Sequence, residues 1–293
     1  MASSATDSSG KDRDIRQKLV ETGHVDVMMS VGNNFFYTKS LPCSIWFFDK
    51  GKAEAIQDHV LFIDARNYYT VVDRTLNEWS EWQLKNLNAI VWLYRGEVDK
   101  YQNLLREYAC AITDMTHALR DACEPLCALL ADGAAGHVRG NLWDADSAND
   151  PKFETLKKRL NWELEVIKKA VAISKEELPK KQHKRMDQAA EEFATQIRDI
   201  LLVLQERTWL YEKFGEGEYR DIPGLCKMAS RAEVAEKNYS LTPGAYVGVA
   251  AVEDDGVDFA QRMGEIHREL QKLQAESNEL IQTISRNMKE MGL

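Results

Sequence analysis

Short apolar runs and longer helical stretches divide this chain into two parts. Residues 25–31, 43–48 and 60–65 are apolar runs bounded by turn-forming residues, a pattern that predicts three β-strands. The preceding residues 14–21 have the spacing of a short helix, with apolar side chains that include Ile15 on one side. A helix followed by three strands within about fifty residues predicts the edge of an α/β sheet.

From residue 76 onward almost every segment has helical periodicity. A first long helical stretch is expected over residues 76–130. Residues 131–150 are rich in Gly, Ala, Asn and Asp and are interpreted as a linker or long loop. A second helical block is expected to begin at Pro151, to break at Pro179 and to continue over residues 181–214.

Two shorter segments follow the long helices. Residues 230–236 predict a short helix, and LTPGAYVG at 241–248 predicts an extended segment with a turn at Pro243-Gly244. The last helix then carries a heptad pattern, with charged residues filling its outer positions. Its apolar seam consists of Phe259, Met263, Ile266, Leu270, Leu273, Leu280 and Ile284. The pattern leaves open whether this seam packs on another chain or on helices of the same chain.

Three adjacent aromatic residues, Phe35, Phe36 and Tyr37, stand in the predicted loop between the first two strands. A loop is an unusual place for so much aromatic surface, because burial usually requires a regular element with a core face. Either the loop folds under a neighbouring element, or the rings stack on a ligand.

Composition and charge exclude several classes of protein. No stretch approaches the roughly 18 apolar residues of a membrane span, and the polar N-terminus lacks the apolar segment of a secretory signal. The expected compartment is therefore the cytoplasm, where the five cysteines are reduced thiols. The net charge, 38 − 47 = −9, argues against a broad basic face for nucleic acid, although a partner subunit could supply one.

The common motifs of catalysis and metal binding are absent from the sequence. Gly215-Glu216-Gly217 follows a helical stretch rather than a strand, so it is interpreted as a helix end. Cys123 and Cys127 are the best zinc candidates, but they lie in an apolar helical stretch and are interpreted as buried thiols. No metal site is predicted.

Four segments in order carry a resemblance to a known family. They are residues 14–52, which combine a helix, a strand, N-x-F-[FY]-x4-P and an apolar strand ending in Asp-Lys-Gly; VLFIDAR at 60–66; LTPGAYVG at 241–248; and the heptad helix. Together they resemble the C-terminal half of the modification subunit of type I restriction-modification enzymes, which are adenine-N6 DNA methyltransferases. Ala245 stands where an Arg is common in the family.

The resemblance implies a fold and a division of the chain. The expected class is α+β and mostly helical, with a partial S-adenosylmethionine-dependent methyltransferase sheet edge, a large helical region and a C-terminal heptad helix. The expected parts are a loop or disordered start at 1–12, the end of the methyltransferase α/β domain at 13–75, a helical region at 76–252, and a coiled-coil-like docking helix at 253–293.

The family motifs that bind S-adenosylmethionine and perform catalysis precede the matching segment and are not found in this sequence. We therefore expect this chain alone to bind no cofactor, to contain no catalytic residue and to be inactive. It looks like a truncated product or one piece of a split subunit.

The resemblance also implies site residues and partners. Phe36, or Phe35 one position away, is expected to stack on an extruded target adenine. The heptad seam is expected to dock on the DNA-reading specificity subunit. A second modification subunit, a restriction subunit and DNA complete the expected complex. The alternative is a non-enzymatic helical assembly module that binds the specificity subunit.

Overall fold

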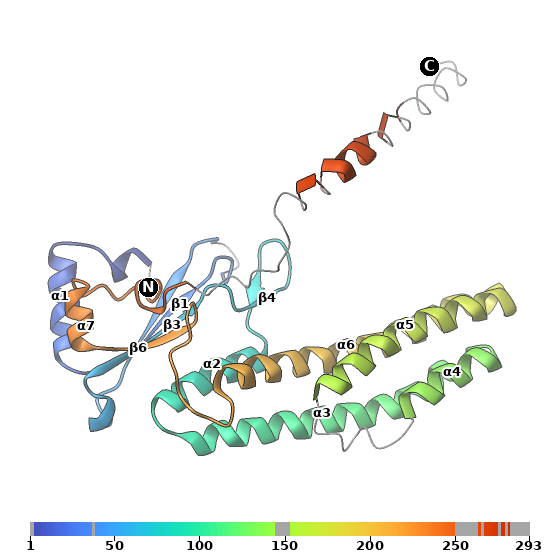
Figure 1. Cartoon of the computed structure of the whole chain (residues 1–293), viewed down its shortest axis with the longest axis horizontal. Helices are drawn as coiled ribbons and strands as arrows, with labels where there is room; N and C mark the ends of the chain where they lie inside the picture. Colours follow the sequence, from blue (N-terminus) through green and yellow to red (C-terminus); the bar gives the residue numbers. More distant parts are fainter. Residues whose placement is uncertain are drawn as a thin grey trace. The chain divides into compact units, whose positions relative to one another are not determined.

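The computed structural model comprises two compact units, residues 1–250 and residues 251–293. The residues that it describes are 3–36, 39–143, 153–249, 263–264, 267–274, 277–278 and 281. The larger unit holds a small mixed sheet and a group of long helices, and its trace is shown in Figure 1.

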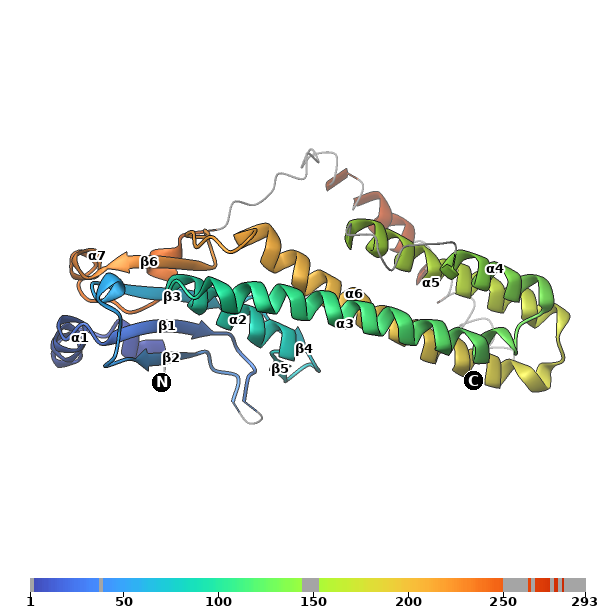
Figure 2. The same cartoon turned by 90° about the horizontal axis from the view of Figure 1, so that it is seen from below.

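A four-stranded sheet confirms the three predicted strands and adds a fourth. The strands are β1 (Val25–Val31), β2 (Cys43–Phe48), β3 (His59–Ala65) and β6 (Cys226–Ser230), in the order β2-β1-β3-β6 (Figure 2). β1 and β3 run parallel, whereas β2 and β6 are antiparallel to their neighbours. Every residue of β1 is buried, as expected for the central strand of a sheet covered on both faces.

One face of the sheet is covered by three short helices, α1 (Lys11–Glu21), α7 (Arg231–Glu236) and α8 (Gly244–Val247). The ring of Phe62 in β3 stacks on the ring of Tyr246 in α8, with centroids 3.7 Å apart. The segment LTPGAYVG therefore packs on the strand that carries VLFIDAR, although nearly 180 residues separate the two in sequence.

The N-terminal segment is more ordered than the predicted loop start. A 3-10 turn, η1 (Ser3–Thr6), precedes α1. The guanidinium of buried Arg16 donates hydrogen bonds to the backbone carbonyl oxygens of Tyr239 (2.9 Å) and Ser8 (2.6 Å). The helix thus buries Arg16, while Ile15, expected on its apolar side, is 56% exposed. The physical reason is that backbone carbonyls of distant segments satisfy the arginine, which no local pattern predicts.

Among the described residues, the helical region contains five long helices. They are α2 (Glu81–Tyr94), α3 (Val98–Cys127), α4 (Asp132–Trp143), α5 (Phe153–Glu177) and α6 (Lys180–Phe214). α3 and α6 lie side by side in both views, and their buried residues form one core with the second face of the sheet (Figures 1 and 2). Pro179 is the N-cap of α6, which confirms the break predicted there.

α4 occupies part of the segment predicted to be a linker or loop. Gly133 and Gly136 weaken its local helical signal. Its small apolar residues Ala134, Ala135 and Val138 are nevertheless buried in the core shared with the other long helices. Tertiary packing therefore outweighs the poor propensity, and the loop prediction over residues 131–150 is wrong for α4.

The predicted helical region, 76–252, also contributes a strand. β6 has a sequence, CKMAS, with weak strand propensity, and it is formed by pairing with β3. The predicted short helix at 230–236 is confirmed as α7. The segment at 241–248 is not simply extended, because it contains the helical turn α8.

An ion pair joins the sheet to the helical region. Asp26, buried within β1, pairs with Arg95 at the C-terminal end of α2, and the ammonium of Lys52 lies 3.9 Å from its Oδ1. Burial is the main cause that lowers the pKa of Lys52. A short 3-10 turn, η2 (Glu54–Ile56), lies between Lys52 and the start of β3.

The described part of the second unit is helical. Residues 263–264, 267–274, 277–278 and 281 are in helical conformation, and the side chains of Met263, Leu270 and Leu273 are exposed. The other four positions predicted for the seam, Phe259, Ile266, Leu280 and Ile284, lie outside the described residues.

The predicted class, α+β and mostly helical, is confirmed. None of the helices that the structure describes combines the length and apolarity needed to cross a lipid bilayer.

Candidate functional site

The carboxyl ends of the parallel strands meet at one edge of the sheet, beside the first residue of β2. Val31, the last residue of β1, pairs with Cys43 on one side and with Ala65 on the other. Open α/β sheets bind ligands outside the carboxyl ends of their strands. A cavity of about 500 Å³ opens here and is lined by Thr6, Ser30, Val31, Gly32, Asn33, Pro42, Cys43, Ser44, Arg66, Asn67, Tyr69 and Thr242.

Gly32 lets the two strand ends come close together. A Cβ atom at this position would lie 2.7 Å from the backbone oxygen of Arg66. That contact is with backbone, which cannot rotate away as a side chain could. Glycine is therefore required for the chain to leave β1 beside the end of β3.

A bidentate ion pair stands at the end of β3. The Nε and Nη2 atoms of Arg66 donate to the carboxylate of Asp64 over 2.8 and 2.6 Å. The hydrogen bond to Asp64 is the main cause that raises the pKa of Arg66. A Cβ on Gly244 would lie 3.0 Å from Arg66 Nη2, so the start of α8 packs against this pair. The segments 60–66 and 241–248 therefore meet here.

A tight turn leads from Gly32 to the aromatic residues. Asn34 has a positive φ of 63°, a conformation that asparagine tolerates better than most residues. The backbone N–H of Asn77 donates to the carbonyl of Asn34 (2.7 Å), and its side-chain amide donates to the carbonyl of Asn33 (2.9 Å). Asn77 belongs to β5 (Asn77–Glu78), which pairs with β4 (Thr70–Val71).

Phe35 and Phe36 have different surroundings. The ring of Phe35 is half-buried, with its centroid 4.7 Å from that of Trp79 and 5.9 Å from that of Tyr69. Phe36 is 49% exposed, and its carbonyl accepts a hydrogen bond from the N–H of Lys39. Tyr37 lies outside the described residues. Neither phenylalanine lines the cavity, but Tyr69 both lines it and contacts Phe35.

A buried polar network holds the loop that supports Phe35. Glu206 of α6 accepts hydrogen bonds from the hydroxyl of Tyr68 and from the side-chain amides of Gln83 and Asn86 in α2. Burial is the main cause that raises the pKa of Glu206. The indole of Trp79 donates to the carbonyl of Tyr68 (2.7 Å). The position of Phe35 is thus coupled to the packing of α2 against α6.

Sequence patterns did not predict most of this support. Glu206, Asn77 and Trp79 have no motif, and each becomes relevant only through a contact with a distant segment. The one feature of the sequence that could have indicated this network is a polar residue on the apolar face of a predicted helix, such as Asn86.

The cavity offers mainly hydroxyl and amide groups, together with the guanidinium of Arg66 and the thiol of Cys43. Ser30, Asn33, Asn67 and Thr242 can donate and accept hydrogen bonds beside the ring of Tyr69. None of the lining residues carries a carboxylate. Such a set can position a flat, polar ligand, but it holds no carboxylate or imidazole that could act as a general base.

The thiols considered as zinc ligands are buried in α3. The Sγ atoms of Cys123 and Cys127 lie 3.4 Å apart. Across the part of the chain that the structure describes, no three His, Cys, Asp or Glu side chains come together as a metal ion would require.

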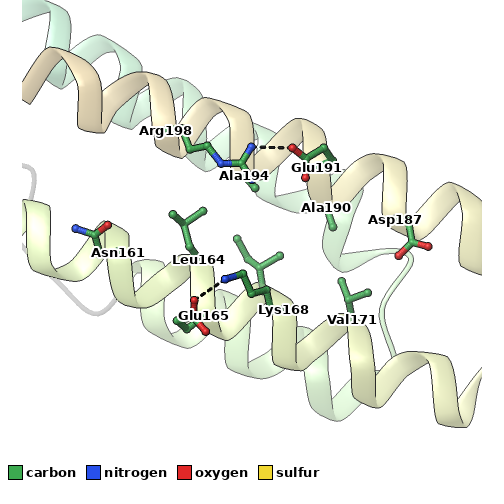
Figure 3. Close-up of a pocket in the computed structure, with 11 residues that line it drawn as sticks. Asn161, Leu164, Glu165, Lys168, Val171, Asp187, Ala190, Glu191, Ala194 and Arg198 are labelled. Atoms are coloured by element: carbon green, nitrogen blue, oxygen red, sulfur yellow. Dashed lines mark hydrogen bonds and ion pairs between the residues drawn. The ribbon is translucent and has the colours of Figure 1, made fainter. Parts of the chain in front are cut away.

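A second cavity, of about 830 Å³, lies between α5 and α6 (Figure 3). Apolar side chains, including Leu164 and Val171, face the space between the helices. Ion pairs stand at its sides, from Lys168 to Glu165 (2.6 Å) and from Arg198 to Glu191 (2.7 Å). This cavity shares no lining residue with the one at the sheet edge and presents no chemistry beyond helix packing.

Comparisons with known proteins find similarity to DNA methylases. Residues 1–113 match the family described as N-6 DNA Methylase. The chain is 40% identical over 74 residues to the type I restriction enzyme HindI methylase subunit of Haemophilus influenzae. These 74 residues are 25% of this chain and 17% of that protein. It is 22% identical over 292 residues to the type I restriction enzyme MjaIX methylase subunit of Methanocaldococcus jannaschii, covering 100% of this chain and 31% of that protein.

One solved structure is also similar. It is the methyltransferase subunit of a type I restriction-modification system from Streptococcus thermophilus, with 18% identity and a TM-score of 0.29. The similarity covers 32% of this chain and 19% of that one.

The chain spans less than a third of the length of either curated relative. The matched residues 1–113 include β1, β2, β3 and the aromatic turn between the first two strands. Residues 1–113 therefore carry the similarity to N-6 DNA methylases, and the chain is similar to the methylase subunits of type I restriction enzymes.

Proposed function

We propose that this chain provides the surface that stacks on the target base in an adenine-N6 DNA methyltransferase of a type I restriction-modification assembly. The observation that carries the proposal is the pair of phenylalanines at the carboxyl edge of the sheet. Phe35 is held by Trp79 and Tyr69, and it fixes the turn from which the exposed ring of Phe36 projects. Phe36 is the residue that stacks on the extruded adenine.

Stacking has a clear energetic role in such a reaction. Extruding a base from the duplex costs a few kcal/mol, and a ring that stacks on the free base recovers about 1–3 kcal/mol. A ring held on a rigid turn loses little conformational freedom when it binds. The support of Phe35 by two further aromatic rings gives this turn that rigidity.

The methyl donor of the proposed reaction is S-adenosylmethionine, held by parts of the methylase that this chain does not span. Nucleoside ribose groups in α/β folds are commonly held by an acidic side chain. The lining of the sheet-edge cavity has no carboxylate, and nearby Asp64 is already bound by Arg66. These residues do not fit the cofactor, so we assign it no contact in this chain and propose that the chain alone is inactive.

The exposed apolar side chains of the C-terminal helix support a docking role. Met263, Leu270 and Leu273 follow the spacing of the heptad seam. We assign the seam to the specificity subunit, in a cytoplasmic complex that also contains a second modification subunit and a restriction subunit. With a net charge of −9, the chain meets DNA through that complex.

A Phe36→Ala variant tests the stacking role. The chain is assembled with the rest of a type I methylase subunit and a specificity subunit, and methyl transfer from labelled S-adenosylmethionine to DNA is measured. We expect the variant to be at least tenfold slower, which corresponds to about 1.4 kcal/mol of lost stacking. Trp162→Ala, which removes an equally exposed ring from α5, serves as the control and should leave the rate unchanged. An unchanged rate for Phe36→Ala would refute stacking.

The second candidate is a non-enzymatic assembly module, favoured by the same exposed side chains of Met263, Leu270 and Leu273. It predicts that the chain binds a specificity subunit but that no combination of subunits restores methylation. Methylation by the complete assembly and not by the chain alone separates the two functions.

A further inference from the structure

The turn between α5 and α6 carries a basic surface in a chain that is acidic as a whole. Residues 168–187 contain seven Lys and Arg and three Asp and Glu side chains, a net charge of +4. The whole chain has a net charge of −9, so the rest of it carries −13. Such a local reversal of sign is typical of a surface that meets a polyanion.

Four of these cations lie together at the start of α6 and define what we call the basic tip. They are Lys180, Lys181, Lys184 and Arg185. All four are exposed, and within the part of the chain that the structure describes none of them forms an ion pair. Asp187, the first acidic residue of α6, is already paired with Lys175 over 2.7 Å. The basic tip therefore presents uncompensated positive charge to solvent.

The position of these cations lowers the stability of α6. The N-terminal end of a helix has a partial positive charge, so acidic side chains stabilise it and cations destabilise it. α6 has no acidic residue in its first turn, and its N-cap, Pro179, makes no side-chain hydrogen bond. α2 shows the usual arrangement, with Glu81 in its first turn and a capping box formed by Ser80 and Gln83. Local rules are broken most often at functional sites, so the charges of the tip indicate a ligand.

The basic tip stands on a packed base. In Figures 1 and 2 the turn between α5 and α6 lies at the end of the helical region away from the sheet. The Oγ of buried Ser174, in the last turn of α5, accepts a hydrogen bond from the N–H of Ala131, between α3 and α4, over 2.9 Å. Buried Met186 anchors the start of α6 in the core. The cations are therefore held at a fixed place in the fold.

The chemistry of the tip fits phosphate better than it fits a protein partner. Among residues 174–187 no large apolar side chain is exposed. Protein interfaces are depleted in lysine and rely on apolar or aromatic anchors. Lysine and arginine on an exposed helix are instead the usual partners of backbone phosphates. Under the proposed function, the polyanion that this chain meets is duplex DNA.

The length of α6 relates the tip to the aromatic turn. Glu206, which holds the loop that supports Phe35, follows the four cations by 21–26 residues on the same helix. An α-helix rises about 1.5 Å per residue, so the separation is about 30–40 Å. One turn of B-DNA spans about 34 Å. A duplex that lies along α6 with its target base at Phe36 therefore presents phosphates to the tip about one helical turn away.

We propose that the basic tip binds the phosphate backbone of duplex DNA about one helical turn from the target adenine. The position of the contact rests on the proposed function, whereas the binding of phosphate does not. The contact is independent of base sequence, because phosphates carry no sequence information directly. With the rest of the chain acidic, it is weak in the isolated chain and adds affinity within the complex.

Salt-dependent binding of DNA tests the tip. The full-length chain is titrated onto a fluorescent random duplex of about 40 base pairs, and anisotropy is measured from about 20 to about 200 mM salt. The tip variant is Lys180→Gln, Lys181→Gln, Lys184→Gln and Arg185→Gln. It should bind at least tenfold more weakly at the lowest salt. The slope of log affinity against log salt should be smaller by about 3–4, since each phosphate contact contributes about 0.9.

A matched control makes the same change of charge elsewhere on the surface. It removes four exposed cations outside the tip, by Lys11→Gln, Lys18→Gln, Lys50→Gln and Arg106→Gln. Its slope should change by less than about 1. Circular dichroism monitors folding, and the tip variant should unfold at no lower temperature than the wild type, because it removes unfavourable charge from a helix N-terminus. Equal losses in both variants, or no duplex binding by the unaltered chain at the lowest salt, overturn the proposal.

A series of shortened duplexes tests the position of the contact. The chain is assembled with the rest of a type I methylase subunit and a specificity subunit, and the DNA is cut back on either side of the target. Affinity should fall once one flank is shorter than about ten base pairs, in the assembly with the unaltered chain but not with the tip variant. The same fall in both excludes the tip as the contact.

Two further outcomes are decisive. If the tip variant loses affinity for phosphatidylserine vesicles and keeps its affinity for DNA, the ligand is a membrane surface and the proposal is wrong. Loss of duplex binding in the tip variant, combined with an assembly that does not methylate DNA, supports this inference while it counts against the proposed function.

Discussion

Phe35 and Phe36 are adjacent in the sequence, yet only one of them is exposed. Phe35 is half-buried against Trp79 and Tyr69, and Phe36 projects into solvent. The first alternative raised by the sequence therefore holds for Phe35, which packs against neighbouring rings, whereas Phe36 remains exposed. Stacking on adenine stays a prediction.

Gly32→Ala is expected to destabilise the fold. Its Cβ would lie 2.7 Å from the backbone oxygen of Arg66, so one strand end must move. We expect a loss of about 1–3 kcal/mol in the free energy of unfolding, measured by urea denaturation. Gly133→Ala is the control, because it meets no atom within 4 Å in a helix and should raise stability by about 0.5–1 kcal/mol. Equal stability of the Gly32 variant and the wild type would contradict the close packing.

Glu163 predicts a pH dependence of stability. Its carboxylate is buried in α5 with no hydrogen-bond partner among the described residues, and burial raises its pKa from 4.5 to about 7. Below pH 4.5 the group is protonated in both folded and unfolded chains. Between pH 4.5 and 7 only the unfolded chain releases the proton, so stability is progressively lost as the pH rises.

Glu163→Gln should remove this loss, which amounts to at most about 3 kcal/mol. The difference in unfolding free energy between the variant and the wild type is measured from pH 4 to pH 8, and it should grow with pH in favour of the variant. Glu165→Gln, at an exposed carboxylate paired with Lys168, should show no such growth. A pH-independent difference for Glu163→Gln would mean that the carboxyl titrates normally.

The helices α2 and α6 support the turn of Phe35 through the loop that contains β4 and β5. The loop that contains β4 and β5 holds the turn of Phe35, and this loop is attached to α2 and α6 by the hydrogen bonds of Glu206. The site therefore depends on the helical region and not on the sheet alone.

Tyr68→Phe tests this support. Loss of the hydroxyl leaves Glu206 with one donor fewer in a partly buried network, which should lower stability by about 1–2 kcal/mol and speed hydrogen exchange across residues 66–80. Tyr211→Phe removes an equivalent hydroxyl–carboxylate bond, to Glu216, from an exposed position. It should change stability by less than about 0.5 kcal/mol. If the two variants behave alike, the network does not hold the loop.

The whole molecule combines a compact unit of residues 1–250 with a C-terminal unit whose described residues are helical. Apolar residues at heptad spacing remain exposed on that helix, and a lone helix gains little stability from propensity. The assignment of this seam to a specificity subunit is a proposal at the scale of the assembly.

Leu270→Asp together with Leu273→Asp should abolish binding to a specificity subunit, with an affinity at least a hundredfold weaker by titration calorimetry. Buried charges in a helix–helix seam lack partners. Gln271→Asp together with Gln274→Asp adds the same charges on the same helix outside the seam and should bind normally. Thermal unfolding of residues 1–250 should be unaffected by either pair. Comparable loss in both variants would exclude the seam as the contact.

The sequence by itself determined the three strands predicted over residues 25–31, 43–48 and 60–65 and the helical character of the long stretches, because these depend on local periodicity. It did not predict the break at Gly96 that divides the stretch at 76–130 into α2 and α3. It did not predict α4 or β6, whose local propensities are weak and whose stability comes from neighbours distant in the chain.

Tertiary structure alone decided which phenylalanine is exposed and which strands form the edges of the sheet. Phe35 is half-buried because Trp79, 44 residues later, packs on its ring. β2 is an edge because β3 and β6 assemble on the other side of β1. Local pattern specifies which residues seek burial, but the partner that buries them is chosen only when distant segments meet.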